Sequence, residues 1–149
     1  MADPASITWP GHATVLIELD GMRILTDPVL RRRIGPLTRI GPPVPADAGE
    51  RIDLVLLSHL HADHADLPSL RRLAGSAHLV VPRGSGPWLR TKGLTNVREI
   101  GVGEEFDFGD FRLSTTRAEH DGRRRPMGGG AAAEALGYVV RGSRSLYFA

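Results

Sequence analysis

The chain has 149 residues, of which 41% are hydrophobic and 24% are charged, a balance that is ordinary for one globular domain or part of one. Nineteen basic and 17 acidic side chains leave a formal net charge of +2, which is too small to argue for nucleic-acid binding. The sequence contains no cysteine, so disulfides and thiolate metal ligands are excluded and any transition-metal site must use histidine and carboxylate.

The N-terminal segment carries no targeting signal that the sequence makes visible. Residues 1–15 lack the basic stretch followed by an apolar stretch that marks a signal peptide. No apolar run approaches the roughly 18 residues that a membrane span requires. We therefore expect a cytoplasmic protein without a transmembrane segment.

The first third of the chain has the pattern of a β-hairpin followed by a loop. Residues 7–9 and 13–19 are rich in β-branched and apolar side chains, which predicts extended structure. Asp20-Gly21 is a strong signal for a two-residue hairpin turn, and 22–26 is expected to be the returning strand. Residues 28–50 contain five prolines, which predicts an irregular loop.

The middle of the chain alternates apolar runs with helix signals. Residues 53–58 (DLVLLS) are typical of a strand buried on both faces. Asp66 is a suitable N-cap for a helix over 67–74, with Pro68 tolerated in its first turn. Strands are also expected at 78–81 and 97–100, with a short helix between them at 86–91.

The last third is expected to hold two hairpins separated by a flexible stretch. The hairpins are predicted over 105–115, with a turn at Gly109-Asp110, and over 137–148, with a turn at Gly142-Ser143. Residues 128–130 are glycines followed by alanines, which predicts flexible or low-complexity chain. The complete pattern indicates an α/β sandwich in which loops at strand ends carry the chemistry.

A dense cluster of candidate metal ligands directly follows the apolar run at 53–58. His59, His61, Asp63 and His64 place four ligand-type side chains within six positions. Histidines two residues apart at a rigid strand end can hold one ion, and Asp63 with His64 can hold a second about 3.5–4 Å away, as in two-metal hydrolases. A loop that merely caps the next helix explains this composition poorly.

Two histidines elsewhere are candidates for the same site. His120 follows a predicted strand and enters a loop, which fits a third ligand better than an isolated surface histidine. His12 could line the same cleft as a catalytic residue, or could be a loop histidine that hydrogen-bonds the backbone. His78 opens a predicted strand and is expected to be structural.

Two arginine runs, 31–33 and 123–125, could bind phosphate through bidentate hydrogen bonds or could be solvated surface loops. The loops that carry them are expected to rim the cleft, with Arg123 and Arg124 as candidate contacts to an anionic or phosphorylated small-molecule substrate. Aromatic residues are only 5% of the chain, so no stacking platform for single-stranded nucleic acid is expected.

Residues 59–64 (HLHADH) match the HxHxDH motif of the metallo-β-lactamase superfamily. Residues 9–30 (WPGHATVLIELDGMRILTDPVL) resemble the branch that contains ascorbate-phosphate lactonase-like proteins and the N-acylphosphatidylethanolamine-hydrolysing phospholipase D. The resemblance runs from Thr8 to the last residue. It implies an α/β fold, the N-terminal half of the αββα sandwich with mixed sheets and short helices.

The resemblance also implies a ligand set. His59, His61 and His120 would bind a first metal, and Asp63 and His64 a second, with Asp63 also orienting the nucleophile. The implied cofactor is zinc, as one or two ions, with iron or manganese as alternatives. Asp27 matches the early aspartate of the superfamily, which orients ligands from the outer shell, although it could equally be a turn former before Pro28.

Members of this branch have two further ligands, a bridging aspartate and a late histidine, and the aspartate follows a strand that resembles 145–149 (SLYFA). We therefore expect residues 1–149 to form one metallo-β-lactamase-like domain that is incomplete at its C-terminus. Either the sequence is a fragment of a longer protein, or pairing with another chain completes the domain.

The function implied by the resemblance is that of a metal-dependent hydrolase, in which a metal-bound hydroxide attacks an ester, lactone or phosphodiester bond. Two alternatives stay open. One is an incomplete, non-catalytic metal-binding chain that needs a partner or forms oligomers through exposed sheet edges. The other is a nucleic-acid phosphodiesterase, which the arginine runs permit.

Overall fold

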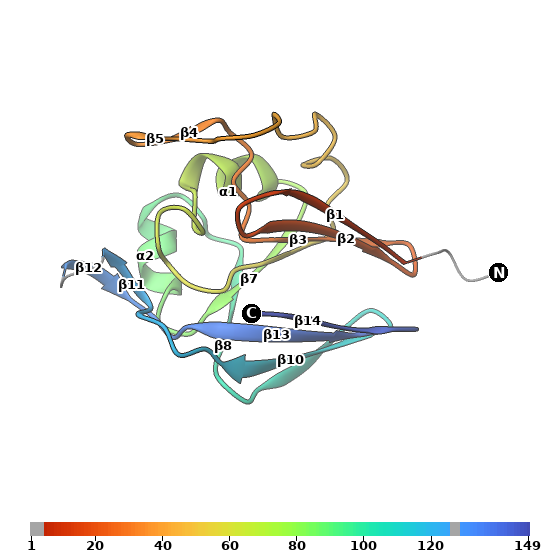
Figure 1. Ribbon diagram of the computed structural model, residues 1–149. Helices are drawn as coiled ribbons and strands as arrows, with labels where there is room; N and C mark the ends of the chain where they lie inside the picture. The colour runs from red at the N-terminus through yellow and green to blue at the C-terminus, as the bar shows by residue number, and fades with distance from the viewer. Residues whose placement is uncertain (1–4, 126–128) are drawn as a thin grey trace.

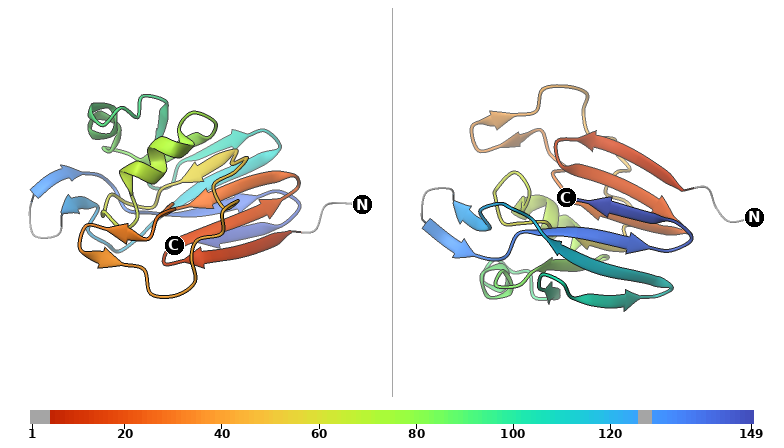
Figure 2. Two further views of the ribbon diagram at one scale, coloured as in Figure 1. Left: turned by 90° about the horizontal axis from the view of Figure 1, so that it is seen from above. Right: turned by 60° about the horizontal axis from the view of Figure 1, so that its bottom comes forward.

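The computed structural model describes residues 5–125 and 129–149. The chain folds into two packed β-sheets, with two helices against the first sheet (Figures 1 and 2). The strands of the six-stranded first sheet are, in spatial order, β1 (Ser6–Gly11), β2 (Thr14–Leu19), β3 (Met22–Thr26), β6 (Leu54–Leu56), β7 (His78–Pro82) and β8 (Val97–Ile100). The strands of the four-stranded second sheet are β14 (Ser145–Phe148), β13 (Leu136–Arg141), β10 (Phe111–Arg117) and β9 (Glu105–Phe108).

Two helices and two small hairpins complete the described chain. The helices are α1 (Leu67–Leu73) and α2 (Gly86–Thr91). The hairpins pair β4 (Arg33–Ile34) with β5 (Leu37–Thr38), and β11 (Arg123–Arg125) with β12 (Gly129–Ala132). None of the described helices has the length and apolar character that crossing a membrane requires.

The pairing within the first sheet determines where the candidate site forms. β1, β2 and β3 are antiparallel, whereas β3, β6, β7 and β8 run parallel to one another. Thr26 at the end of β3 lies opposite Leu56 at the end of β6. Asp27 and the chain that leads to His59 therefore leave the sheet side by side, at its carboxyl edge.

The apolar run of β6 lies between two hydrophobic layers. Leu54 and Leu56 pack toward the second sheet, whereas Val55 and Leu57 pack toward the helices, and all four are completely buried. This alternation follows from the period-2 geometry of a strand. The expectation of a strand buried on both faces is confirmed.

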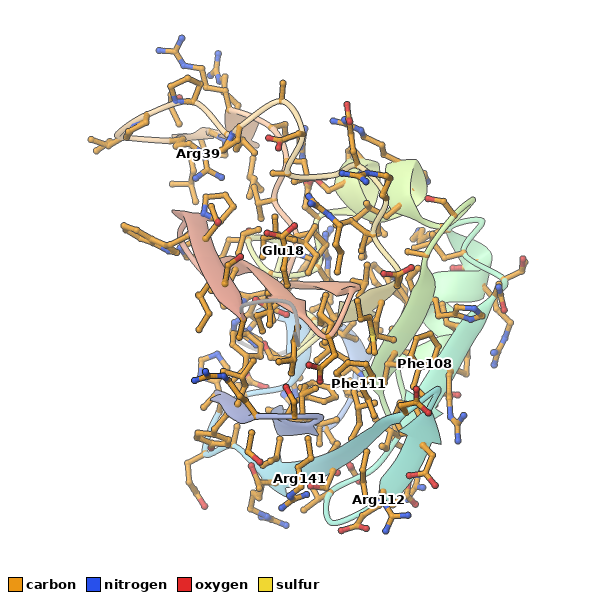
Figure 3. All side chains as sticks on the ribbon, turned by 90° about the vertical axis from the view of Figure 1, so that its right-hand side faces the viewer. Glu18, Arg39, Phe108, Phe111, Arg112 and Arg141 are labelled. Carbon is orange, nitrogen blue, oxygen red and sulfur yellow. The ribbon has the colours of Figure 1, made fainter. Side chains whose placement is uncertain are left out.

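The second sheet presents one face to the core and the other to solvent. Phe111 is buried in the layer between the sheets, and Figure 3 shows it there. Arg112 and Arg141 are register partners on β10 and β13, and both are exposed on the opposite face of this sheet (Figure 3). The fold class expected from the sequence, an α/β metallo-β-lactamase sandwich with mixed sheets and short helices, is confirmed.

Two loops contain more regular structure than the sequence predicts. The chain at 28–50 contains the β4–β5 hairpin, because Gly35 adopts a positive φ of 53° and allows a tight turn before Pro36. Gly129–Ala132 is not irregular chain but strand β12, because its backbone pairs with β11. Residue 128, which was included in the flexible stretch, lies outside the described residues.

Candidate metal centre

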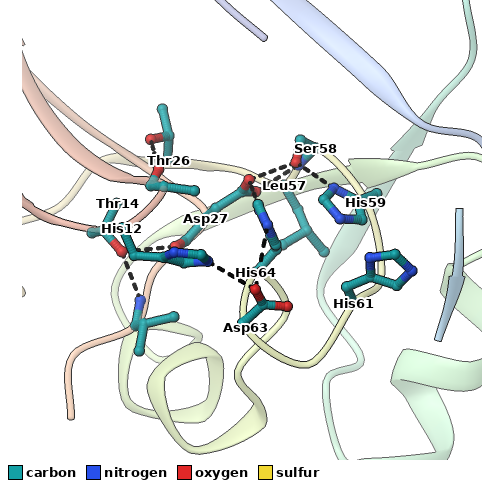
Figure 4. Close-up of polar contacts among 12 residues, drawn as sticks. His12, Thr14, Thr26, Asp27, Leu57, Ser58, His59, His61, Asp63 and His64 are labelled. Atoms are coloured by element: carbon teal, nitrogen blue, oxygen red, sulfur yellow. Dashed lines mark hydrogen bonds and ion pairs between the residues drawn. The ribbon is translucent and has the colours of Figure 1, made fainter. Parts of the chain in front are cut away.

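The HLHADH segment forms a tight loop between the end of β6 and the start of α1 (Figure 4). The carbonyl of His61 accepts hydrogen bonds from the backbone amides of His64 (3.0 Å) and Ala65 (2.8 Å), which closes the turn. The Asp66 side chain then caps α1 by accepting from the Ser69 amide at 3.2 Å, as expected from the sequence. The loop is therefore fixed at both ends by regular structure.

The structure brings His59, His61 and His120 together into a first group of candidate ligands. One ligand atom from each lies within 4.8 Å of the others, and His120 Nε2 is 3.2 Å from His61 Nδ1. Within the described part of the chain, the buried Nε2 atoms of His59 and His61 have no hydrogen-bond partner. An unpaired buried polar atom costs about 1–3 kcal/mol. A metal ion bound through His59 Nε2 would remove that cost there.

Ser58 and Asp27 control which nitrogen of His59 is free. Ser58 Oγ donates to Asp27 Oδ2 at 2.5 Å and lies 2.9 Å from His59 Nδ1. Because Ser58 donates its only hydroxyl hydrogen to Asp27, its oxygen must accept a hydrogen bond from the Nδ1–H of His59. His59 Nε2 is then left with a lone pair, which is the state that a metal ligand requires.

Asp27 is completely buried at the end of β3 and connects both parts of the site. Its carboxylate accepts from the Ser58 amide at 2.7 Å and from His64 Nδ1 at 2.7 Å (Figure 4). The second contact leaves His64 Nε2 free, 3.8 Å from Asp63 Oδ2. Asp27 thus lies where a residue that orients imidazole ligands must lie.

A second group of candidate ligands consists of His12, Asp63 and His64, whose ligand atoms also lie within 4.8 Å of one another. His12 extends from the turn between β1 and β2, and its Nε2 is 2.9 Å from Asp63 Oδ2 (Figure 4). The rings of His59 and His64 have centroids only 4.0 Å apart, so the two groups adjoin.

Electrostatics keeps His59 and His61 in the neutral, ligand-competent state. Burial, reinforced by His64 and His120, lowers the pKa of His59 to about 3. Burial and the neighbouring His120 also lower the pKa of His61. Both imidazoles are therefore uncharged at neutral pH, and neutral imidazole is the form that binds metal.

In the second group, hydrogen bonds and neighbouring charges outweigh the effect of burial on the pKa values of His64 and Asp63. Burial opposes the charged form of His64, but the hydrogen bond and charge of Asp27, together with Asp63, outweigh it and raise its pKa. Burial raises the pKa of Asp63, but its backbone hydrogen bond and the nearby His64 and His12 outweigh this effect and lower it. Asp63 is therefore an anion at neutral pH, so this group offers a cation one negative charge.

The two arginines expected to contact substrate lie in different surroundings. Arg123 is exposed on β11, where its amide bonds the side chain of Asp121 at 3.0 Å. Arg124 Nη1 donates to the carbonyls of Leu60 (2.9 Å) and Ala65 (2.8 Å). Arg124 therefore braces the loop that carries the ligands, and its contact with an anionic substrate stays a prediction.

A cavity of about 640 Å³ adjoins the second group, and both His12 and Asp63 line it. Its walls come mainly from the β1–β2 turn and from the chain around the β4–β5 hairpin, with Trp9, Leu37 and Ile40 among the apolar side chains. Its charged lining, besides Asp63, consists of arginines, at positions 31, 32 and 39. The loop at 28–50 thus rims a cavity beside the site, as expected.

Sequence reasoning missed two residues that support the site, Ser58 and Tyr138, and it missed the bracing role of Arg124. Ser58 could have been found, because it directly precedes the motif and is the hydroxyl nearest to it in sequence. Tyr138, whose hydroxyl donates to the Leu57 carbonyl at 2.8 Å, gives no local signal. The bracing contacts of Arg124 likewise depend on a hairpin far along the chain.

The fold and the site together define a class: a β-sandwich that gathers histidines and a carboxylate at its strand ends, as metal-dependent hydrolases do. Residues 22–149 match the family model described as a beta-lactamase superfamily domain. The chain belongs to this family, which confirms the resemblance stated from the sequence.

The chain is similar to known proteins that include a metal-dependent hydrolase, a phospholipase D and a diiron enzyme. A UPF0173 metal-dependent hydrolase of an Exiguobacterium species is 35% identical over 116 residues, covering 77% of this chain and 48% of the relative. An N-acyl-phosphatidylethanolamine-hydrolyzing phospholipase D of Caenorhabditis elegans is 31% identical over 135 residues, covering 78% of this chain and 38% of the relative. The chain also resembles the crystal structure of CmlA, a diiron beta-hydroxylase from Streptomyces venezuelae, with a TM-score of 0.73 and 28% sequence identity. The match covers 97% of this chain and 29% of CmlA. The chain thus spans less than half the length of these three proteins.

Proposed function

We propose that this chain provides the metal centre of a hydrolase that cleaves an ester, lactone or phosphodiester bond. One observation carries the proposal: His59, His61 and His120 converge at a strand end, with the buried Nε2 of His59 unpartnered among the described residues. Three imidazoles that converge in this way are a ligand set of catalytic zinc. The membership of the chain in a family that includes metal-dependent hydrolases supports the same reading.

The donor set fits zinc, and also iron or manganese, because imidazole and carboxylate suit each of them. His59, His61 and His120 would hold one ion, and Asp63 with His64 would contribute to a second. A metal held there supplies Lewis-acid polarisation of a substrate oxygen and a water nucleophile whose pKa is lowered to roughly 7.

The residues of the chain itself perform the positioning. Asp27 fixes the His64 ring directly and the His59 ring through Ser58, so each presents Nε2 to the site. Asp63 is ionised and 37% of its side chain is exposed toward the cavity. Its carboxylate can accept a hydrogen bond from the attacking water and orient it toward the substrate.

The cavity beside Asp63 supports a substrate class within this proposal. Apolar walls at Trp9, Leu37 and Ile40 suit an acyl or other apolar group. Among the lining arginines, Arg31 is paired with Asp66 and Arg39 donates to backbone carbonyls, so Arg32 is the one that suits an anionic group. A small anionic ester or phosphodiester that carries an apolar group meets both requirements. The phospholipase D relative has a name that describes a substrate of this kind.

The test is hydrolysis of p-nitrophenyl acetate and bis(p-nitrophenyl) phosphate by the zinc-loaded chain, with and without a chelator. We expect turnover that the chelator abolishes and that the double variant His59→Ala/His61→Ala lacks. His78→Ala is the matched control, because His78 lies on β7 and packs against Phe108, outside both groups. Turnover that survives the double substitution would refute the proposal, and stoichiometric metal binding without turnover would favour the non-catalytic alternative.

A further inference from the structure

His12 does not belong to the HxHxDH motif, yet the structure places it in the second group of candidate ligands. We infer that His12 is a direct ligand of the second metal ion and joins Asp63 and His64, so that the described residues offer this ion two imidazoles and one carboxylate. The inference rests on the proposed function and deepens it, because it assigns a third protein ligand to the second ion.

The first argument for His12 as a ligand is the spacing of the ligand atoms. Two atoms bound tetrahedrally to one zinc ion, each about 2.0–2.1 Å from it, lie roughly 3.3 Å from each other. His12 Nε2 is 2.9 Å and His64 Nε2 is 3.8 Å from Asp63 Oδ2, so the two distances bracket that value. The corresponding distance in the first group, between His120 Nε2 and His61 Nδ1, is 3.2 Å.

The second argument is the backbone conformation of His12. His12 has a φ of +57°, a left-handed conformation that few residues other than glycine adopt. Such strain costs on the order of 1–3 kcal/mol and persists where the surrounding structure enforces it, commonly at functional sites. Here the turn is held from two sides: Trp9 Nε1 donates to the His12 carbonyl at 2.8 Å, and Arg39 Nη1 donates to the Pro10 carbonyl at 2.8 Å.

The third argument is the chemistry of the donor atoms in the second group. His12 brings a second imidazole beside the carboxylate of Asp63, with its Nε2 2.9 Å from Asp63 Oδ2, so a divalent cation in this group meets imidazole and carboxylate donors together. With His12 included, the described residues offer three ligand atoms to each of the two groups. His12 and Asp63 also line the 640 Å³ cavity, so an ion held by this group would lie beside the proposed substrate cavity.

The test is a zinc titration of the chain by calorimetry, together with metal content measured by elemental mass spectrometry. The main variant is His12→Asn, because asparagine tolerates the left-handed conformation and removes the imidazole. His12→Gln is the second variant, because its amide can still donate a hydrogen bond to Asp63. His78→Asn is the matched control, and circular dichroism of every variant checks the fold.

We expect two zinc ions per wild-type chain and two in His78→Asn. Both His12 variants should keep the first ion, and their affinity for the second should fall by more than the roughly 10- to 100-fold that loss of an outer-shell partner costs. If His12→Gln binds the second ion as tightly as the wild type does, His12 only orients Asp63 and the inference is wrong. One ion in the wild type overturns the inference but leaves the proposed function intact, whereas no ion overturns both.

Discussion

The hydroxyl of Tyr138 donates a 2.8 Å hydrogen bond to the carbonyl of Leu57, which ties the second sheet to the strand end from which the metal-binding loop departs. Both residues are completely buried. Tyr138→Phe removes the hydroxyl and leaves the Leu57 carbonyl unpaired, so we expect a loss of about 1–3 kcal/mol in the free energy of unfolding. Urea denaturation at pH 7 measures this loss, and an unchanged midpoint would show that the bond contributes nothing.

Tyr138 also predicts a dependence of stability on alkaline pH. Burial, with a contribution from the charge of Asp27, raises its pKa well above the ordinary value of 10. Above pH 10 the unfolded chain therefore ionises this residue while the folded chain does not, so stability falls by up to about 1.4 kcal/mol per pH unit from this residue alone.

Urea denaturation of the wild type and of Tyr138→Phe between pH 9 and pH 11 isolates that contribution. The stability of the wild type should decline more steeply than that of the variant as the pH rises above 10. Parallel declines in the two proteins would mean that Tyr138 ionises as easily in the folded state as in the unfolded state.

Ser58→Ala should weaken metal binding without removing a ligand. The substitution breaks the chain of hydrogen bonds from Asp27 through Ser58 to His59 Nδ1, so His59 is free to adopt either tautomer. We expect the affinity of the first site for zinc to fall by roughly 10- to 100-fold, the usual effect of losing an outer-shell partner. Competition with a chromophoric chelator measures it, and an affinity equal to that of the wild type would refute the proposed relay.

Arg124→Gln separates the bracing role of this residue from substrate binding. Loss of the two hydrogen bonds to the Leu60 and Ala65 carbonyls should loosen the loop and lower the affinity for zinc. Arg123→Gln is the matched control, because Arg123 is the exposed neighbour on the same strand. A selective rise in KM for anionic substrates, with zinc affinity unchanged, would instead assign Arg124 to the substrate.

Leu37→Ser tests the apolar wall of the cavity. Leu37 is 63% exposed on β5 and lines the cavity. In a series of p-nitrophenyl esters, we expect its substitution to reduce kcat/KM for a long acyl chain several-fold, because each buried methylene contributes about 0.8 kcal/mol, and to leave the acetate unaffected. Val102→Ser is the control, since Val102 is exposed but absent from the cavity lining. Equal losses for short and long chains would contradict an acyl-binding role.

Much of this fold follows from short-range signals in the sequence. Asp20-Gly21 marks the β2–β3 turn, Asp66 caps α1, and DLVLLS identifies a strand buried between two layers, because each pattern has a local physical cause. The HxHxDH loop was recognisable for the same reason, since its ligands are neighbours in sequence.

The rest of the site depends on contacts that only the folded chain creates. His12 meets Asp63 because the β1–β2 turn and the loop after β6 lie at one edge of the sheet. The sequence of neither segment predicts that contact. The β4–β5 hairpin formed despite its prolines because Gly35 permits the turn between two very short strands. The role of each candidate ligand, the substrate and the cytoplasmic location stay predictions.

The most direct test of the metal centre is the metal content of the purified chain after dialysis against zinc, measured by elemental mass spectrometry beside the His59→Ala/His61→Ala variant. We predict stoichiometric zinc in the wild type, with the first ion lost from the variant. No retained zinc in the wild type, or equal zinc in both proteins, would contradict the assignment of these histidines as metal ligands.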